Sequence, residues 1–412
     1  MSHNRRSFTL QALAAATLAL GGGAARAEDT IKVGVLHSLS GTMAISETVL
    51  KDTILMAIDE VNAKGGVLGR KLEMVVVDET ENPEVGINAI KKLTAEEKVD
   101  VLVGGYTSGV TLAQLPHISN AKTIYLGVGA ASPSITQKVK ADYANYKYIF
   151  RVGPIHAGYQ ARELSGFISS FVKGELGISK IAIVGENAKW VQDLVPILKK
   201  SATEGGADVR MTELFDTQMS DFSPLLAKVK DSGAQYMIVV LSHASSDVFA
   251  KQWHDARFPM AYGGIDVKGM DGDFCDRIGG KSVGEISANF AVRAPITPKT
   301  IPFFDEFKKR TGRSPVYTAF GAYDAIHIYA EAAARAKSVE GDALIKELEK
   351  TSYVGIPGTI QFDEMHDVKP AAPGHKGPAF LMAQWRDKCT REVIYPKALR
   401  TAEYAPPAWI KK

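Results

Sequence analysis

Val103-Gly-Gly-Tyr-Thr-Ser-Gly109 decides the fold of this chain. The largely apolar residues 99–103 before it predict a buried strand, and the residues after it predict a helix. Two glycines let the backbone approach a ligand closely, and Tyr106, Thr107 and Ser108 stand where the first turn of the helix has free N–H groups. The stretch predicts either a seat for an anion or carboxylate, or an ordinary strand-to-helix turn with hydroxyl caps.

A second loop of the same kind follows one unit later. Residues 123–126 predict a strand, and Gly127-Val-Gly-Ala-Ala-Ser-Pro-Ser134 is the small-residue loop after it. The carboxyl edge of a parallel sheet is where open α/β sheets bind ligands. The two loops together therefore predict one pocket at that edge.

The first 27 residues predict a signal peptide and not a part of the fold. Arg5-Arg6 precedes the apolar residues 10–20, and Ala25-Arg-Ala27 has the small-x-small form of a cleavage site. Asn4-Arg-Arg-Ser-Phe8 is similar to the twin-arginine export motif, and an ordinary Sec signal is the alternative. We expect the mature chain to begin at Glu28 and to reach the periplasm of a bacterium, with no transmembrane helix.

Composition limits the partners and the number of domains. The chain has 49 Lys and Arg residues, three of them in the signal segment, against 46 Asp and Glu residues. Balanced charge argues against nucleic acid or an anionic membrane as a partner. A chain of 412 residues exceeds the usual size of one hydrophobic core, so two domains are expected. Cys275 and Cys389 are the only cysteines, and neither a metal nor a cofactor is expected.

Strands alternate with helices along the chain, which predicts a mainly parallel sheet in each of two doubly wound lobes. A fresh strand-helix series begins after the extended segment 148–154 and repeats the architecture of the first half. Predicted strands are 31–36, 72–77, 99–103, 123–126, 180–185, 208–215, 236–241, 260–265, 285–292, 358–362, 379–385 and 392–395. Predicted helices are 47–64, 83–96, 161–172, 191–205, 222–232, 246–256, 301–311, 319–336 and 341–351.

An ordered series of segments resembles the type I periplasmic solute-binding proteins of branched-chain amino acid, amide and urea uptake. Its main members are Ile31-Lys-Val-Gly-Val-Leu-His-Ser-Leu-Ser-Gly-Thr42, Val61-Asn-Ala-Lys-Gly-Gly-Val-Leu-Gly69, the two loops and Phe320-Gly-Ala-Tyr-Asp-Ala325. The resemblance covers essentially the whole mature chain. It implies two α/β lobes, linked by three crossovers, that close on a small molecule and deliver it to an ABC permease.

With this resemblance, residues 28–150 plus 292–355 are expected in the first lobe, and 151–291 plus 356–412 in the second. Cys275 and Cys389 then both fall in the second lobe, where a disulfide between them would not cross the hinge. We predict that they are joined. A monomer is expected.

The resemblance also implies ligand contacts. Tyr106 and Ser108 match first-lobe positions that meet the ligand, and Gly129, Ala130 and Ala131 match the second loop. Amino-acid binders generally place Thr or Ser where this chain has Ala131, so either Ser132 takes over or the polar clamp is partly missing.

The second lobe is expected to supply the remaining contacts. Trp190 matches an aromatic residue that would pack an apolar group or a cation, with a buried interlobe indole as the alternative. His243 lies where the family has a ligand-facing residue, with an ordinary surface histidine as the alternative. Asp266 lies near the position of the acid that, in amino-acid binders, pairs with the α-ammonium group of the ligand. If Ile265 is the true match, that partner is absent.

The sequence carries no nucleophile elbow, zinc-protease motif or phosphate-binding loop with its lysine. We therefore expect a periplasmic binding protein for a small solute, which is an amino acid, an amide, urea, a betaine or an aromatic acid. The alternatives are a ligand-sensing protein with the same fold and no transport role, and, more distantly, a hydrolytic enzyme.

Overall fold

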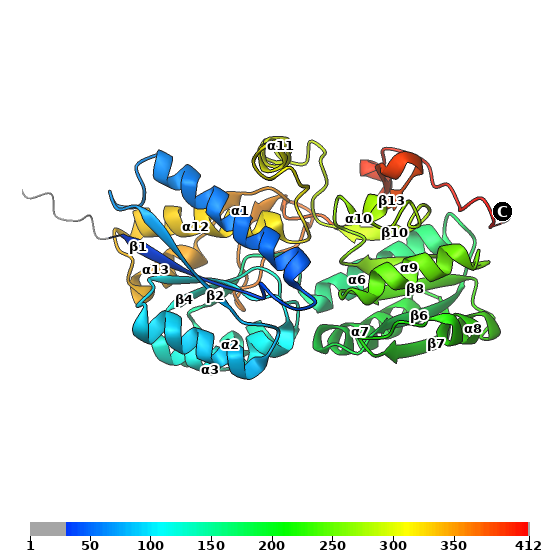
Figure 1. Cartoon of the computed structure of the whole chain (residues 1–412), viewed down its shortest axis with the longest axis horizontal. Helices are drawn as coiled ribbons and strands as arrows, with labels where there is room; N and C mark the ends of the chain where they lie inside the picture. The colour runs from blue at the N-terminus through cyan, green and yellow to red at the C-terminus, as the bar shows by residue number, and fades with distance from the viewer. Residues whose placement is uncertain (1–29, 411–412) are drawn as a thin grey trace, which may run out of the picture.

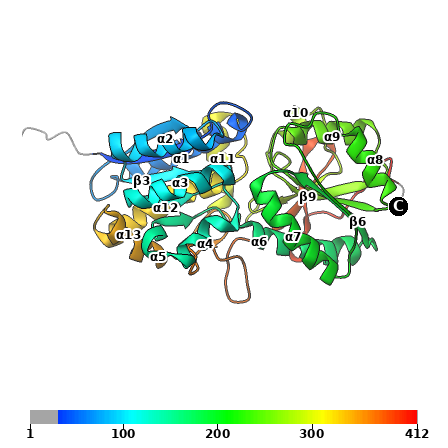
Figure 2. The same ribbon diagram turned by 90° about the horizontal axis from the view of Figure 1, so that it is seen from below.

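A computed structural model describes residues 30–410, so the predicted signal peptide lies outside the described residues. Two α/β units lie side by side along the long axis, with the blue and cyan elements in one and the green elements in the other (Figure 1). The same division is seen after a turn of 90° (Figure 2). The predicted fold class of two doubly wound lobes is confirmed.

The first lobe is built on a five-stranded parallel sheet of order β2-β1-β3-β4-β5. Its strands are β1 (Ile31–His37), β2 (Leu72–Asp78), β3 (Val101–Gly104), β4 (Ile124–Gly127) and β5 (Ile149–Arg151). The helices between and after them are α1 (Ala44–Ala63), α2 (Pro83–Lys91), α3 (Ser108–Ala121), α4 (Pro133–Ala141) and α5 (Tyr143–Tyr146). A π-helical turn, Lys92–Glu96, continues α2.

The second lobe has a seven-stranded sheet of order β14-β13-β10-β9-β8-β6-β7. Its five parallel strands are β6 (Lys180–Glu186), β7 (Asp208–Phe215), β8 (Tyr236–Leu241), β9 (Ala261–Asp266) and β10 (Ile286–Asn289), and its antiparallel strands are β13 (Leu381–Trp385) and β14 (Arg391–Tyr395). Its helices are α6 (Ala157–Phe167), α7 (Lys189–Glu204), α8 (Ser223–Asp231), α9 (Ser245–Asp255) and α10 (Phe274–Arg277). In chain order, the five parallel strands repeat the arrangement of the first sheet.

Three later helices return to the first lobe. They are α11 (Thr300–Thr311), α12 (Ala319–Ala336) and α13 (Gly341–Glu349). Both α11 and α12 pack against α1, and α13 contacts β4 and α12, so the yellow and orange helices lie among blue and cyan elements (Figure 1). The chain therefore passes between the lobes three times. The residue boundaries of the lobes stay a prediction.

Local sequence accounts for the main elements. Every residue of β8 is buried and most are apolar, as parallel strands with both faces covered require. Asn82 caps α2 by accepting from the N–H groups of Glu84 and Val85, with Pro83 at the first helical position.

Two predicted strands, 285–292 and 358–362, are too long. The first forms only as β10, Ile286–Asn289, and the second is shorter still. Only β12 (Thr359–Ile360) forms, and it pairs with β11 (Tyr353–Val354) in a separate two-stranded sheet. Beyond it the chain turns, because the backbone N–H of Lys369 donates back to the carbonyl of Gln361. The segment therefore adds no strand to either lobe.

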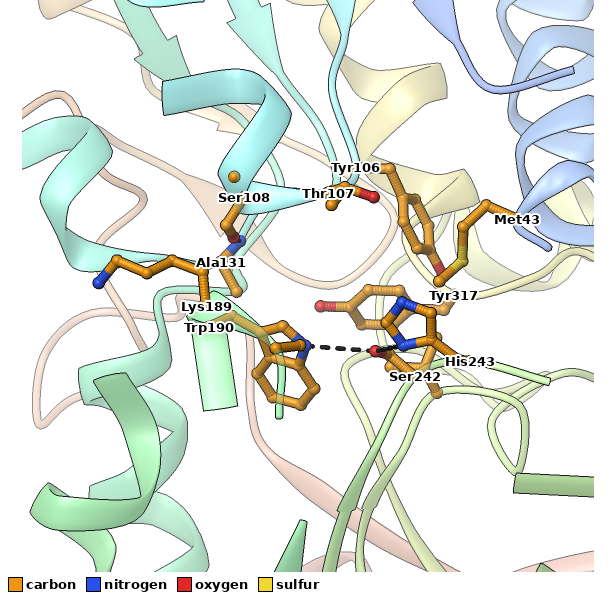
Figure 3. A pocket seen from close by; sticks show the side chains of 14 residues that line it. Met43, Tyr106, Thr107, Ser108, Ala131, Lys189, Trp190, Ser242, His243 and Tyr317 are labelled. Carbon is orange, nitrogen blue, oxygen red and sulfur yellow. Dashed lines mark hydrogen bonds between the residues drawn. The ribbon is translucent and has the colours of Figure 1, made fainter. Parts of the chain in front are cut away.

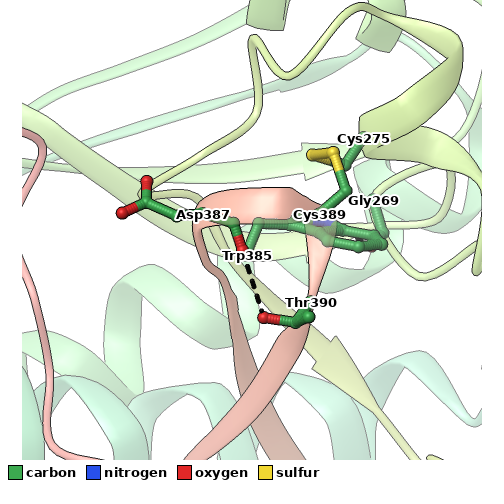
Figure 4. The surroundings of a disulfide bond; sticks show 6 residues. All are labelled: Gly269, Cys275, Trp385, Asp387, Cys389 and Thr390. Atoms are coloured by element: carbon green, nitrogen blue, oxygen red, sulfur yellow. Dashed lines mark hydrogen bonds between the residues drawn. A yellow bond between two sulfur atoms is a disulfide. The ribbon is translucent and has the colours of Figure 1, made fainter.

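The predicted Cys275–Cys389 disulfide is confirmed, and it closes a sequence separation of 114 residues. Cys275 lies in α10, and Cys389 lies in the turn between β13 and β14 (Figure 4). Trp385 packs in the same buried cluster and donates its indole N–H to the carbonyl of Gly269 at 3.0 Å. The bridge ties the C-terminal hairpin to the body of the second lobe.

Within residues 30–410, no helix has the length and apolar character needed to cross a membrane.

We predict that the double variant Cys275→Ser/Cys389→Ser loses about 2 to 4 kcal/mol of unfolding free energy, because its unfolded chain gains freedom. Its ligand affinity should be unchanged, since the bridge stays within the second lobe. Urea denaturation and calorimetry measure the two quantities, and thiol titration of the denatured wild type should find no free thiol. Two reactive thiols in the wild type would contradict the bridge.

Candidate ligand-binding site between the lobes

A cavity lies between the lobes, at the carboxyl ends of their parallel strands. Its empty volume is about 460 Å³, which includes the open space at its mouth. The lining residues come from both lobes (Figure 3). They are Met43, Tyr106, Thr107, Ser108, Gly109, Gly129, Ala131, Ala188, Lys189, Trp190, Ser242, His243, Val267 and Tyr317.

The turn after β3 explains why its two glycines are needed. Gly104 and Gly105 have φ angles of 146° and 75°, which disfavour any side chain. A Cβ on Gly104 would lie 2.1 Å from the carbonyl oxygen of Leu36, and one on Gly105 would lie 1.9 Å from the hydroxyl of Tyr125. The glycines thus serve the packing of the turn itself, which delivers the next three residues to the cavity.

The start of α3 forms the first-lobe wall. Thr107 is its N-cap residue and makes no side-chain cap bond, and its hydroxyl oxygen is buried without a hydrogen-bond partner among the described residues. Ser108 accepts from the backbone N–H groups of Ala131 and Ser132, both at 3.1 Å. The Ser108 oxygen therefore joins the two loops and keeps its own proton available for a ligand.

Three of the predicted contact residues lie outside the lining. Ala130 packs in the core of the first lobe. Ser132 donates to Asp193 of α7, with its oxygen 2.5 Å from Oδ2 of that residue. Asp266 is fully buried and accepts from the Ser246 hydroxyl and from the backbone N–H groups of Lys268 and Gly269. Burial raises the pKa of Asp266 to about 6.

The second-lobe wall contains an indole with a satisfied N–H group. Trp190, in the first turn of α7, donates from Nε1 to the Ser242 hydroxyl at 3.2 Å, which leaves its ring for apolar contact. Tyr106 and Tyr317 face each other edge to face, with ring centroids 6.2 Å apart. Burial raises the pKa of Tyr106 well above its usual value, so its hydroxyl stays protonated.

The lobes also touch beside the cavity. Lys268 of the second lobe is fully buried, and its ammonium donates to the Ser46 hydroxyl of α1 at 2.8 Å. Together with the Ser132–Asp193 bond, this contact joins the lobes in a closed arrangement. Nearby, Glu47 and Glu79 are buried in the first lobe, and burial raises their pKa values to about 8 and about 7.

The residues that sequence reasoning missed are Met43, Gly109, Ala188, Lys189, Ser242, Val267 and Tyr317. Met43 and Val267 follow the ends of β1 and β9, so attention to every strand end would have found both. Tyr317 precedes a helix and carries no such signal. Among the described residues, no group of three or more His, Cys, Asp and Glu residues is placed to hold a metal ion.

Comparison with known proteins agrees with the two-lobed fold. The family model described as "Periplasmic binding protein" matches residues 30–385. A leucine-, isoleucine-, valine-, threonine- and alanine-binding protein of Pseudomonas aeruginosa is 24% identical, covering 89% of this chain and 93% of the relative.

Two solved structures share the fold. A branched-chain amino acid transporter substrate-binding protein from Streptococcus pneumoniae, in complex with isoleucine, has a TM-score of 0.75 at 21% identity, covering 89% of this chain and 100% of that one. An ABC transporter solute-binding protein from R. palustris, in complex with 4-hydroxybenzoate, has a TM-score of 0.75 at 21% identity, covering 92% and 98%. With the family model spanning both lobes, this chain belongs to the periplasmic binding protein family.

Proposed function

We propose that this chain is the substrate-binding component of an ABC importer and that it captures a small carboxylate with an apolar or aromatic body. It acts as a monomer in the periplasm, after export by the twin-arginine or the Sec route. It delivers its ligand to a permease in the inner membrane and carries out no bond chemistry.

The start of α3 carries the proposal for a carboxylate. The first-turn N–H groups of a helix are free and attract negative charge, and the Thr107 hydroxyl is buried there with no hydrogen-bond partner within residues 30–410. Among the described lining residues there is no Asp or Glu, and the charge of Lys189 is paired with Asp193. The free N–H groups of α3 and the lack of an acidic lining residue favour an anionic group over a cationic one at the first-lobe wall.

The remaining walls support an apolar body for the ligand. Met43, Tyr106, Trp190, Val267 and Tyr317 supply aliphatic or aromatic surface. The names of the relatives include both amino acids and 4-hydroxybenzoate. These compounds share a carboxylate on a small body, which is the chemistry that we propose for this cavity.

Closure would follow from contacts that exist only when both walls meet the ligand. A ligand that touches α3 and Trp190 together binds the closed form better than the open one, so it shifts the population toward closure. The contacts between Lys268 and Ser46 would add to the closed form without touching the ligand.

A panel of matched carboxylates and amides tests the function. We expect benzoate, 4-hydroxybenzoate or leucine to raise the melting temperature by a few degrees at saturating concentration, because only the folded chain binds them. Benzamide and leucinamide, which lack the carboxylate, should raise it less, as should urea and glycine betaine. Stabilisation by the amides alone would contradict the proposed ligand class.

Ser108→Ala should weaken binding of the best carboxylate by about 1 to 3 kcal/mol, because it removes a hydroxyl donor and frees the second loop. Calorimetry measures the affinity, and circular dichroism checks the fold. Ser119→Ala, at the other end of α3, is the matched control and should bind like the wild type. Equal affinities for the two variants would remove Ser108 from the site.

Trp190→Ala should cost about 2 to 4 kcal/mol of binding, as for other buried aromatic anchors. Trp190→Phe should cost less for an apolar ligand group, because a flat ring remains. The ligand-induced change in tryptophan fluorescence should disappear in Trp190→Ala. It should remain in Trp409→Phe, since Trp409 bonds to the carbonyl of Phe258 outside the cavity lining. Full affinity in Trp190→Ala would show that the indole is only core.

A further inference from the structure

Glu186 lies behind the second-lobe wall with its carboxylate fully buried at the end of β6. It accepts from the backbone N–H groups of Ser242 at 2.7 Å and His243 at 2.9 Å, and from the Ser245 hydroxyl at 2.7 Å. Burial opposes ionisation, but the hydrogen bonds from His243 and Ser245 hold the pKa of Glu186 below its usual value. The group is therefore an anion that only accepts hydrogen bonds.

This anion fixes the proton on the imidazole of His243. Nδ1 of His243 lies 2.8 Å from Oε2 of Glu186. Because an ionised carboxylate has no proton to give, Nδ1 must carry the hydrogen. In the neutral ring, Nε2 is then an acceptor.

The other polar groups of the second-lobe wall are already used. The Ser242 oxygen accepts from Trp190 and donates to Glu186 at 2.9 Å, and Lys189 pairs with Asp193. His243 Nε2 lies 3.8 Å from Oε1 of Glu81 in the first lobe, which is too long for a hydrogen bond. Figure 3 shows the His243 ring across the cavity from Ser108.

We propose that His243 is a specificity residue whose Nε2 accepts a hydrogen bond from a hydroxyl or amine on the ligand, at the end opposite the carboxylate. Glu186 is the positioning residue that holds Nδ1–H, so that Nε2 is the acceptor of the neutral ring, and Glu81 offers a second acceptor to the same donor. This inference rests on the proposed carboxylate site. A ligand without the donor would leave the desolvated acceptor without a hydrogen bond. Sites built to bond such a donor strongly reject ligands that lack it.

The test compares ligands that differ by one donor. 4-Hydroxybenzoate and 4-aminobenzoate are each measured against benzoate, and threonine against its isostere valine, by calorimetry on the full mature chain. In the wild type, the donor-bearing member of a pair should bind at least tenfold more tightly than its partner. The affinities of 4-hydroxybenzoate and 4-aminobenzoate show whether the site prefers a hydroxyl or an amine donor.

Two variants separate recognition from structure. His243→Phe keeps a ring of similar shape but no acceptor, so the affinity ratio within each pair should fall to near one. Glu186→Gln should lower the same ratio, because the ring then loses the partner that fixes its Nδ1–H. The matched control His254→Phe, at the far end of α9, should keep the wild-type ratio.

Three results would overturn this inference. They are a donor-free ligand that binds as tightly as its donor-bearing partner, a ratio that survives His243→Phe, and binding of leucine with no binding of any paired ligand. In each case the carboxylate proposal stands if the amide controls still stabilise the chain less than the carboxylates do. If no carboxylate binds at all, the proposed function falls and this inference falls with it.

Discussion

The cavity depends on one constraint, which is that two parallel sheets of the same strand order meet at their carboxyl edges. Right-handed strand-helix-strand connections give each sheet a point where the strand order reverses, between β1 and β3 in one lobe and between β6 and β8 in the other. Loops at these points diverge to opposite faces and leave a crevice. All lining residues except Tyr317 follow one of the strands β1, β3, β4, β6, β8 and β9.

Charge at the site comes from the backbone and from buried side chains rather than from exposed ones. The start of α3 offers free N–H groups, and the Glu186 anion orients the opposite wall through Ser242 and His243. The closed arrangement also buries the Lys268 ammonium against Ser46, and such a group is buried only with a partner. Closure in this account therefore depends on contacts between the lobes as well as on the ligand.

Much of the fold was predictable because its signals are local. Buried parallel strands appear in the sequence as apolar runs, as in Tyr236–Leu241. Helix starts are marked by capping residues, as at Asn82. The second-lobe disulfide followed from assigning both cysteines to one lobe. The short strand Thr359–Ile360 was overestimated, because the turn of the chain beyond it is set by tertiary hydrogen bonds.

The site was only partly predictable. Ser108 and Ser132 are alike in sequence, yet one lines the cavity and the other bonds to Asp193 across the lobes. Glu186 gave no signal, because a buried acid at the end of an apolar strand is recognised only by its partners. Small-angle X-ray scattering with the carboxylate that stabilises the chain most shows whether ligand binding closes the lobes. We expect a larger radius of gyration without ligand and, with it, the value calculated from this closed structure. An unchanged radius at saturation would contradict this expectation.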